Sequence, residues 1–386
     1  MIHVHVVREK SIRSVVGDKI PHFTHPLHFP SIIQVQTFGK FLVLRRHEMD
    51  IFMILKLLGG LALFLYGMKL MGDGLQALAS GKMTQILERL TNKTIYGVLL
   101  GAGVTAVIQS SSATTVMVVS LVNSGVMSLR QAVGVIMGAN IGTTITSWLL
   151  SMVGIQSDAV FIKLLKPSSF APILAMIGVV LYMKAKENAK RTNISHLLIG
   201  FSVLIFGMDA MSASMEPLAH SPYFENMLVA VSNPFFGILV GMVFTAIIQS
   251  SSASVGILQA LSLTGAVSFG AALPIILGQN IGTCSTALLS SVGASKNARR
   301  ASMIHLYFNV VGVTVFTLAF YGLNMIFNFE FLSAAVGPVA IAVIHSVFNV
   351  GSTMIIYPFS KHLVRLAEYT VPDDRVSTGY SSLHKI

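Results

Sequence analysis

Apolar residues dominate the chain from residue 51 onward, and they fall into runs of two lengths. Half-length runs adjoin a cluster of polar residues: Thr94–Ile108 precedes the cluster and Ser112–Asn123 follows it. After a turn at Gly125 and Ser128, we expect a short apolar piece that ends at Gly138. Other runs are long enough for a membrane-crossing helix of about 20 residues; they lie near residues 51–72, 168–183, 195–212, 302–327 and 336–359. The pattern predicts an all-α polytopic membrane protein with broken or re-entrant helices around the polar clusters.

The chain contains an internal duplication with an offset of 140 residues. The motif Gln109–Ala113 recurs as Gln249–Ala253, and Asn140–Thr143 recurs as Asn280–Thr283. Across the 51 positions from 101 to 151, 22 residues are identical to their partners without a gap. Paired repeats in an apolar chain are typical of secondary transporters, which place their sites at the repeat interface.

The duplication divides the chain into four parts. We assign residues 49–193 to transport repeat 1, and residues 194–365 to transport repeat 2 with a C-terminal transmembrane helix. Residues 366–386 are expected to form a polar cytoplasmic tail. Residues 1–48 carry seven Lys and Arg against three Asp and Glu. We interpret them as a disordered arm or an upstream-start extension, because Met49 directly precedes the first long apolar run.

The composition excludes several other classes of protein. Hydrophobic residues make up 53% of the chain and charged residues 11%, less than half the usual charged fraction of about 25%. A soluble globular enzyme is therefore excluded. The single cysteine, Cys284, excludes a disulfide framework. The net charge of +11 belongs to the N-terminal arm and to short loops, so nucleic acid is not an expected partner.

Each polar cluster is a glutamine followed by three serines, which is more than helix packing requires. Three consecutive residues point around most of a helical turn, and each unsatisfied polar group in hydrocarbon costs several kcal/mol. We therefore interpret the duplicated clusters as a binding site. The serines are Ser110, Ser111, Ser112, Ser250, Ser251 and Ser252, and carboxamides come from Gln109, Gln249, Asn140 and Asn280.

The chain around both clusters contains no Asp, Glu, Lys, Arg or His, either in Thr94–Leu129 or in Asn226–Ser295. Hydroxyls and carboxamides can donate to an anion and can also coordinate a hard cation. Because proton coupling usually needs an intramembrane carboxylate or histidine, we expect sodium to be the coupling ion. We expect no catalytic residue, no resident metal and no cofactor. Arg130 is interpreted as a loop charge, and Asp209 as either an ion ligand or an interfacial residue.

A shorter motif is also repeated: His305 and Asn309 have the same spacing as His345 and Asn349. Residues four apart share a helix face, and we interpret both pairs as polar contacts between helices. The rival interpretation is an intramembrane serine hydrolase that uses a cluster serine and a histidine. It is disfavoured because the chain has no G-x-S-x-G elbow and no evident acid partner.

The paired motifs resemble those of the type II sodium/phosphate cotransporters, in their bacterial branch, over about residues 50–365. The resemblance implies sodium-coupled import of inorganic phosphate through the plasma membrane, by an elevator-like alternating-access motion between inverted repeats. It makes the six serines phosphate and sodium ligands. Supporting roles fall to Gln109, Gln249, Asn140, Asn280, Thr143 and Thr283. The expected partners are phosphate, sodium and the lipid bilayer, and a homodimer stays open.

Two alternatives also stay open. One is a sodium-coupled transporter of another small oxyanion or metabolite. The other is a channel-like or regulatory membrane protein without coupled flux.

Charge supports the inversion of the repeats. The linker 73–93 carries Lys82, Arg89 and Lys93, whereas its partner 213–233 carries no Lys or Arg and has two glutamates. Because cytoplasmic loops are enriched in Lys and Arg, we expect the two linkers to lie on opposite faces of the membrane.

Overall fold

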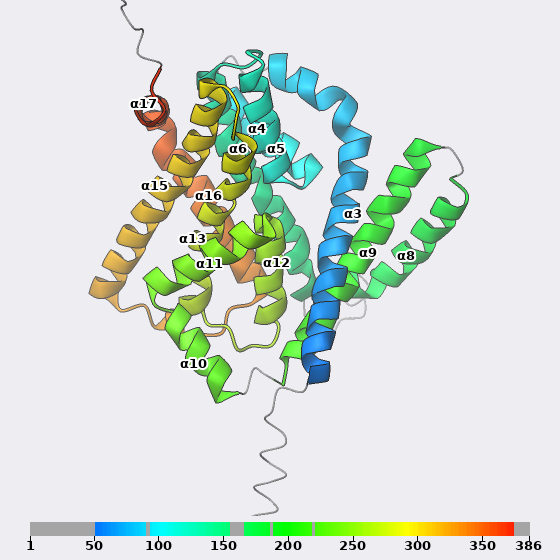
Figure 1. Ribbon diagram of the computed structural model, residues 1–386. Helices are drawn as coiled ribbons and strands as arrows, with labels where there is room; N and C mark the ends of the chain where they lie inside the picture. The colour runs from blue at the N-terminus through cyan, green and yellow to red at the C-terminus, as the bar shows by residue number, and fades with distance from the viewer. Residues whose placement is uncertain (1–50, 90–92, 155–165, 186–187, 218–220, 374–386) are drawn as a thin grey trace, which may run out of the picture. The chain divides into compact units, whose positions relative to one another are not determined.

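Every regular element described in the computed structural model is a helix (Figure 1). The structure describes residues 51–89, 93–154, 166–185, 188–217 and 221–373. The expectations for residues 1–48 and for the end of the polar tail lie outside the described residues. The α-helices are α3 (Ile51–Arg89), α4 (Thr94–Ile108), α5 (Ser111–Asn123), α6 (Leu129–Ser151), α8 (Pro167–Met183), α9 (Ala189–Met215), α10 (Pro222–Val231), α11 (Pro234–Ile248), α12 (Ser251–Ser262), α13 (Phe269–Gly282), α14 (Cys284–Ser290), α15 (Lys296–Phe327), α16 (Pro338–Ile356) and α17 (Ser360–Thr370).

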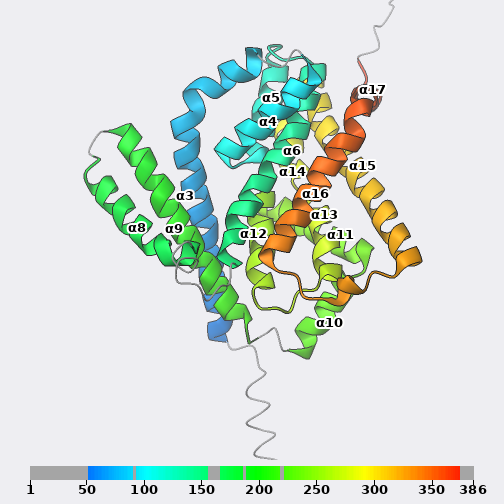
Figure 2. The same cartoon turned by 180° about the vertical axis from the view of Figure 1, so that it is seen from behind.

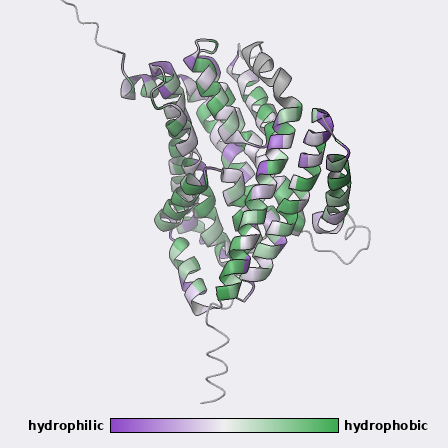
Figure 3. Cartoon of the chain, turned by 45° about the vertical axis from the view of Figure 1, so that its right-hand side comes forward, coloured by the Kyte–Doolittle hydropathy of each residue, from purple (hydrophilic) through white to green (hydrophobic). Residues whose placement is uncertain are grey.

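Six helical stretches of the described chain are long and apolar enough to cross a membrane, which confirms a polytopic membrane protein. Their ranges are Ile51–Leu78, Leu129–Gly154, Ala189–Met215, Phe269–Ser290, Lys296–Phe327 and Pro338–Thr370. Figure 3 shows hydrophobic residues along most of the length of these helices. The run predicted at 168–183 is α8, a shorter apolar helix of 17 residues.

The predicted short piece ending at Gly138 is wrong, because α6 continues without a break through Gly138 to Ser151. Here glycine serves close helix packing instead of ending a helix. A Cβ atom at Gly138 would lie 2.7 Å from the carbonyl carbon of Val98 and 2.8 Å from the amide nitrogen of Ala102, both on α4. The equivalent helix in the second half, α13, does end, at Gly282, and α14 follows after Thr283.

Helices α3 and α9 are equivalent under the 140-residue offset and pack against each other in opposite directions (Figures 1 and 2). Gly60, near the start of α3, lies against Met211, near the end of α9, whereas Gly74 lies against Asn193. An antiparallel packing of equivalent helices requires a two-fold axis perpendicular to both. The first helices of the two repeats therefore run in opposite directions, as inverted repeats would require.

The contacts between α3 and α9 obey this two-fold relation. A Cβ atom at Gly67 would lie 2.7 Å from the carbonyl oxygen of Gly200, and one at Gly207 would lie 2.8 Å from that of Gly60. Gly67 and Gly207 are 140 positions apart, as are Gly60 and Gly200. Because all four lack side chains, the two backbones approach closely, as in small-residue interfaces of membrane helices.

Helices α4 and α5 form a hairpin that enters the bundle and returns. Gly97 of α4 lies against Gly134 of α6, and Ala102 lies against Gly142, so α4 and α6 run in the same direction. The chain from the end of α5 to the start of α6 spans only residues 124–128, and α5 must therefore run back along α4. Helices α11 and α12 repeat this geometry beside α13. The predicted half-length helices are thus two re-entrant hairpins, and their tips are the glutamine–serine clusters.

The end of the described chain is helical and packed. Arg300 of α15 is buried, and its Nε donates to the carbonyl oxygen of Val371 at 2.9 Å, while its guanidinium pairs with Asp373 at 2.8 Å. Helix α17 packs along α15 and buries Leu363 and Ala367. The polar tail predicted from residue 366 therefore begins as part of a docked amphipathic helix.

Candidate functional site

Each hairpin tip is a sharp turn centred on the cluster glutamine. Gln109 ends α4 with φ 59° and ψ 25°, and Gln249 ends α11 with φ 59° and ψ 23°. These backbones are left-handed, a conformation that is uncommon for residues other than glycine. Both amides donate to the carbonyl oxygen four residues earlier, Thr105 and Thr245, at 2.7 Å. A strained non-glycine residue held at matched positions in two repeats indicates a functional constraint.

The first serine of each cluster caps the returning helix. The Oγ of Ser110 accepts from the amide of Ala113 at 3.1 Å, and the Oγ of Ser250 accepts from the amide of Ala253 at 3.2 Å. The first turn of a helix has amide groups without intrahelical partners and carries partial positive charge. The tips therefore present the N-termini of α5 and α12, an arrangement suited to anions.

The two tips meet although they are far apart in the sequence. The Oγ of Ser112 donates to the carbonyl oxygen of Gln249 at 3.4 Å. Thr286 of α14 donates to the Oγ of Ser112 at 3.3 Å, and Thr283 donates to the Oγ of Ser251 at 3.3 Å. The structure thus brings the serine clusters of both repeats and the second Asn-Ile-Gly-Thr motif together. Ser111, Ser251 and Ser252 are buried, whereas Ser112 is partly exposed.

The other predicted residues bind mainly to their own helices. The Nδ2 groups of Asn140 and Asn280 donate to the carbonyl oxygens of Ile136 and Ile276 at 2.9 and 2.8 Å. Thr143 donates to the carbonyl oxygen of Ala139 at 3.0 Å. Thr143 therefore does not repeat the contact that Thr283 makes with the serine cluster of its own repeat.

Two residues that the motifs did not single out hold each hairpin together. Thr105 donates to the hydroxyl of Thr114 at 3.0 Å, and Thr245 donates to that of Ser254 at 2.8 Å, all four being fully buried. Both pairs connect the two arms of a hairpin just below its tip. The 140-residue offset relates these two pairs to each other. This repetition is the sequence signal that could have identified them.

A cavity of about 470 Å³ lies at the tips. Gln109 and Ser110 line it from one hairpin and Ser250 from the other, and α3 supplies a third wall. On that wall the Nζ of Lys69 lies 2.8 Å from Oδ2 of Asp73. The hairpins lack charged side chains, but the cavity as a whole does not. The sequence argument for an uncharged site is therefore wrong for the α3 wall.

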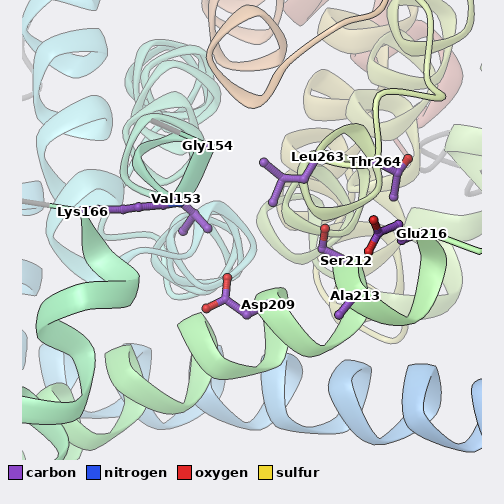
Figure 4. Close-up of a pocket in the computed structure, with 9 residues that line it drawn as sticks. All are labelled: Val153, Gly154, Lys166, Asp209, Ser212, Ala213, Glu216, Leu263 and Thr264. Atoms are coloured by element: carbon purple, nitrogen blue, oxygen red, sulfur yellow. The ribbon is translucent and has the colours of Figure 1, made fainter. Parts of the chain in front are cut away.

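A second cavity, of about 380 Å³, lies along α9. Figure 4 shows Asp209, Ser212 and Glu216 projecting from one side of this helix toward Leu263 and Thr264 at the end of α12. Asp209 accepts from the hydroxyl of Ser168 at 3.4 Å. It lines this cavity and not the one at the hairpin tips. Because α3 and α9 are antiparallel, the two cavities lie toward opposite ends of the bundle.

The two predicted histidines do not form a site with the cluster serines. His305 and His345 are buried on α15 and α16, and neither imidazole has a hydrogen bond to a cluster serine in the described structure. Asn309 donates to its own helix and to the sulfur of Cys284 at 3.4 Å, consistent with a contact between helices. Within the described residues, no group of three or more His, Cys, Asp and Glu side chains could hold a metal ion. Arg130 is exposed near the start of α6, away from the hairpin tip.

Two re-entrant hairpins whose tips meet beside a cavity, within a bundle of antiparallel equivalent helices, define a secondary transporter. The family model of the Na+/Pi-cotransporter matches residues 63–213 and again residues 203–342, two stretches that begin 140 residues apart. The chain belongs to this family, which is a family of transporters and not of enzymes.

The relatives agree with this assignment. The chain is 29% identical over 319 residues to YqeW of Bacillus subtilis, covering 80% of this chain and 95% of that protein. It is 25% identical to YjbB of Escherichia coli, named as a candidate inorganic phosphate export protein, over 83% of this chain and 56% of that protein. The sodium-dependent phosphate transport protein 2B of Homo sapiens is 33% identical over 129 residues, 31% of this chain and 19% of that protein. The chain thus spans about half the length of YjbB. No solved structure gave a significant match.

Proposed function

We propose that this protein is a sodium-coupled symporter that imports inorganic phosphate across the plasma membrane by alternating access. The observation that carries the proposal is the meeting of two helix N-termini and two serine clusters at one cavity. Phosphate needs several hydrogen-bond donors. The tips offer serine hydroxyls and the first amide groups of α5 and α12.

Sodium is supported by the same chemistry. Serine and threonine oxygens and carbonyl oxygens are hard ligands. At the tips they come from Ser112, whose hydroxyl lies within hydrogen-bonding distance of both Thr286 and the carbonyl of Gln249. In this proposal sodium is the only ion required for coupling, and no further cofactor takes part.

The distribution of positive charge orients the protein. The N-terminus of α9 lies beside the C-terminal half of α3, because Gly74 contacts Asn193. The N-terminus of α15 lies at the base of the first hairpin, because Ser295 donates to Asn123 at 2.9 Å. This end of the bundle carries Lys184, Lys190, Arg191, Lys296, Arg299, Arg300, Lys361 and Arg365. By the positive-inside rule this end is cytoplasmic.

Labelling with a membrane-impermeant thiol reagent in intact cells tests the orientation. Cysteine replaces Lys190 or Glu225, both exposed and at opposite ends of the bundle, while the natural Cys284 is buried. We expect Glu225→Cys to react and Lys190→Cys to react only after permeabilisation. Reaction of both in intact cells contradicts the orientation.

Flux measurements in proteoliposomes test the function. We expect radiolabelled phosphate to accumulate only when a sodium gradient is imposed, and arsenate to compete more effectively than sulfate. The name of YjbB points to export, so gradients are imposed in both directions. If phosphate flux does not depend on the sodium gradient, the proposed sodium coupling is rejected. If the protein transports another oxyanion and not phosphate, the proposed substrate is wrong.

A matched pair of variants connects the flux to the tips. We expect Ser251→Ala to lower sodium-dependent flux at least tenfold, since it removes a buried hydroxyl that contacts Thr283. Ser124→Ala removes a hydroxyl at the base of the first hairpin and should leave flux unchanged. If Ser251→Ala shows normal flux at normal protein abundance, the serine cluster is not part of the binding site.

A further inference from the structure

One ion pair stands in the cavity that both hairpin tips share. Lys69 and Asp73 lie one turn apart on α3, and the Nζ–Oδ2 distance is 2.8 Å. Their side chains are 72% and 54% exposed, although both residues belong to a membrane-length helix. Charged side chains within membrane helices are costly and generally mark ion or substrate pathways. Their place on the cavity wall accounts for the exposure.

These two residues carry the charge of the cavity. The hairpins contribute no Asp, Glu, Lys, Arg or His, since none occurs in Thr94–Leu129 or Asn226–Ser295. Among the described residues that line the cavity, Lys69 is the cation and Asp73 the anion. Without ligand they neutralise each other. An exposed i,i+4 pair contributes little stability, so separating the two groups is easy when each gains a stronger partner.

We propose that Lys69 and Asp73 form an exchangeable ion pair that couples the two substrates, Lys69 binding phosphate and Asp73 binding sodium. This inference rests on the proposed function of the same site. When phosphate alone binds Lys69, the carboxylate of Asp73 loses its counter-charge. When sodium alone binds Asp73, the ammonium group of Lys69 loses its counter-charge. With both ligands present, all charges are paired, so each ligand strengthens the binding of the other.

The repeat supports a role specific to this cavity. The positions 140 residues after Lys69 and Asp73 are Asp209 and Ala213, so α9 has no equivalent pair. If the pair served only to pack the two helices, we would expect it on both α3 and α9, as is the case for the glycines at their contact. An ion pair one turn apart on the helix wall instead belongs to the cavity that reaches the hairpin tips, whereas the other cavity is lined by Lys166, Asp209 and Glu216.

Initial rates in proteoliposomes, with one substrate varied and the other saturating, test the exchange. We expect Lys69→Gln to raise the half-saturating phosphate concentration at least tenfold, and Asp73→Asn to raise that of sodium at least tenfold. In both variants the half-saturating sodium concentration should no longer fall as phosphate is increased. Lys69→Arg should restore the phosphate affinity. The control is Lys56→Gln, which removes an exposed lysine from the same helix outside the cavity lining.

The outcomes separate this inference from the proposed function. If the wild-type protein and Lys56→Gln show sodium-dependent phosphate flux and Lys69→Gln matches both, the exchange is rejected. Likewise, Asp73→Asn with wild-type sodium dependence rejects it. If the wild-type protein itself shows no sodium-dependent flux, the proposed function fails. Isothermal titration of phosphate into purified protein, with and without sodium, then measures the affinity of Lys69→Gln independently of flux.

Discussion

Each hairpin packs closely on its neighbouring helix, and this packing predicts that two glycines of α4 and α6 respond differently to the same substitution. Gly138 of α6 faces α4 so closely that a Cβ atom would lie 2.7 Å from the carbonyl carbon of Val98. Gly103 of α4 has no atom within 4 Å of the same position. We therefore compare Gly138→Ala with Gly103→Ala, two changes that add the same methyl group to helices in contact.

The magnitude follows from these distances. Ordinary contact begins near 3.4 Å, so the backbone of α4 must retreat by about 0.7 Å or more in Gly138→Ala. Overpacking of this kind costs about 1–3 kcal/mol. Gly103→Ala removes a flexible residue from an open helix position and stabilises by about 0.5–1 kcal/mol. The two variants should differ by about 1.5–4 kcal/mol in stability, the sum of the two effects.

Transport should be more sensitive than stability. A binding constellation tolerates displacements of only about 0.5 Å, and the retreat of α4 moves Gln109 at its end. We expect Gly138→Ala to melt at a lower temperature in detergent and to lose phosphate flux, while Gly103→Ala melts at or above the wild-type temperature and retains flux. Gly278→Ala, whose Cβ would lie 2.7 Å from the carbonyl carbon of Ile238, should behave like Gly138→Ala. Equal melting and equal flux for Gly138→Ala and Gly103→Ala refute the packing argument.

Two further predictions concern contacts that the structure makes unequal. Thr283→Val should weaken sodium-dependent flux at least fivefold, because it removes a hydroxyl contact of about 1 kcal/mol with Ser251, whereas Thr143→Val, whose hydroxyl bonds its own helix, should change flux by less than twofold. Arg300→Ala should destabilise the protein by about 2 kcal/mol or more and expose α17 to protease, because the buried guanidinium binds the chain end; Asp373→Ala, at an 83% exposed side chain, should change melting little. Equal effects within either pair contradict the assigned contacts.

Much of the local structure could be predicted from the sequence. The 140-residue offset located both hairpin tips, because a polar cluster in an apolar run cannot continue as a lipid-facing helix at no cost. The returning helix begins at Ser111, one residue earlier than predicted, since Ser110 is its cap. Capping depends on a serine followed by free amide groups, and any of three consecutive serines could have provided it.

The length of α6 and the charged wall could not be predicted. Gly138 looks like a helix end in one dimension, but α4 packs against it and makes glycine a requirement of the helix interior. The contact between Ser112 and Gln249 joins residues 137 positions apart. Which helix faces the tips depends on such tertiary contacts. For this reason Lys69 and Asp73 stood out neither as candidate ligands nor as neighbours of the serines.

Two stretches that the repeat makes equivalent line cavities in unequal positions. The offset pairs residues 65–76 of α3 with residues 205–216 of α9, and each stretch lines a cavity. The first cavity reaches Gln109 and Ser250 at the tips, whereas the second stops at Leu263 and Thr264, at the far end of α12. Similar sequences can exchange conformations at a modest difference in free energy. In the exchanged state the α9 cavity would reach the tips and the α3 cavity would close. In the function that we propose, that exchange would open the site to the opposite end of the bundle, as alternating access requires.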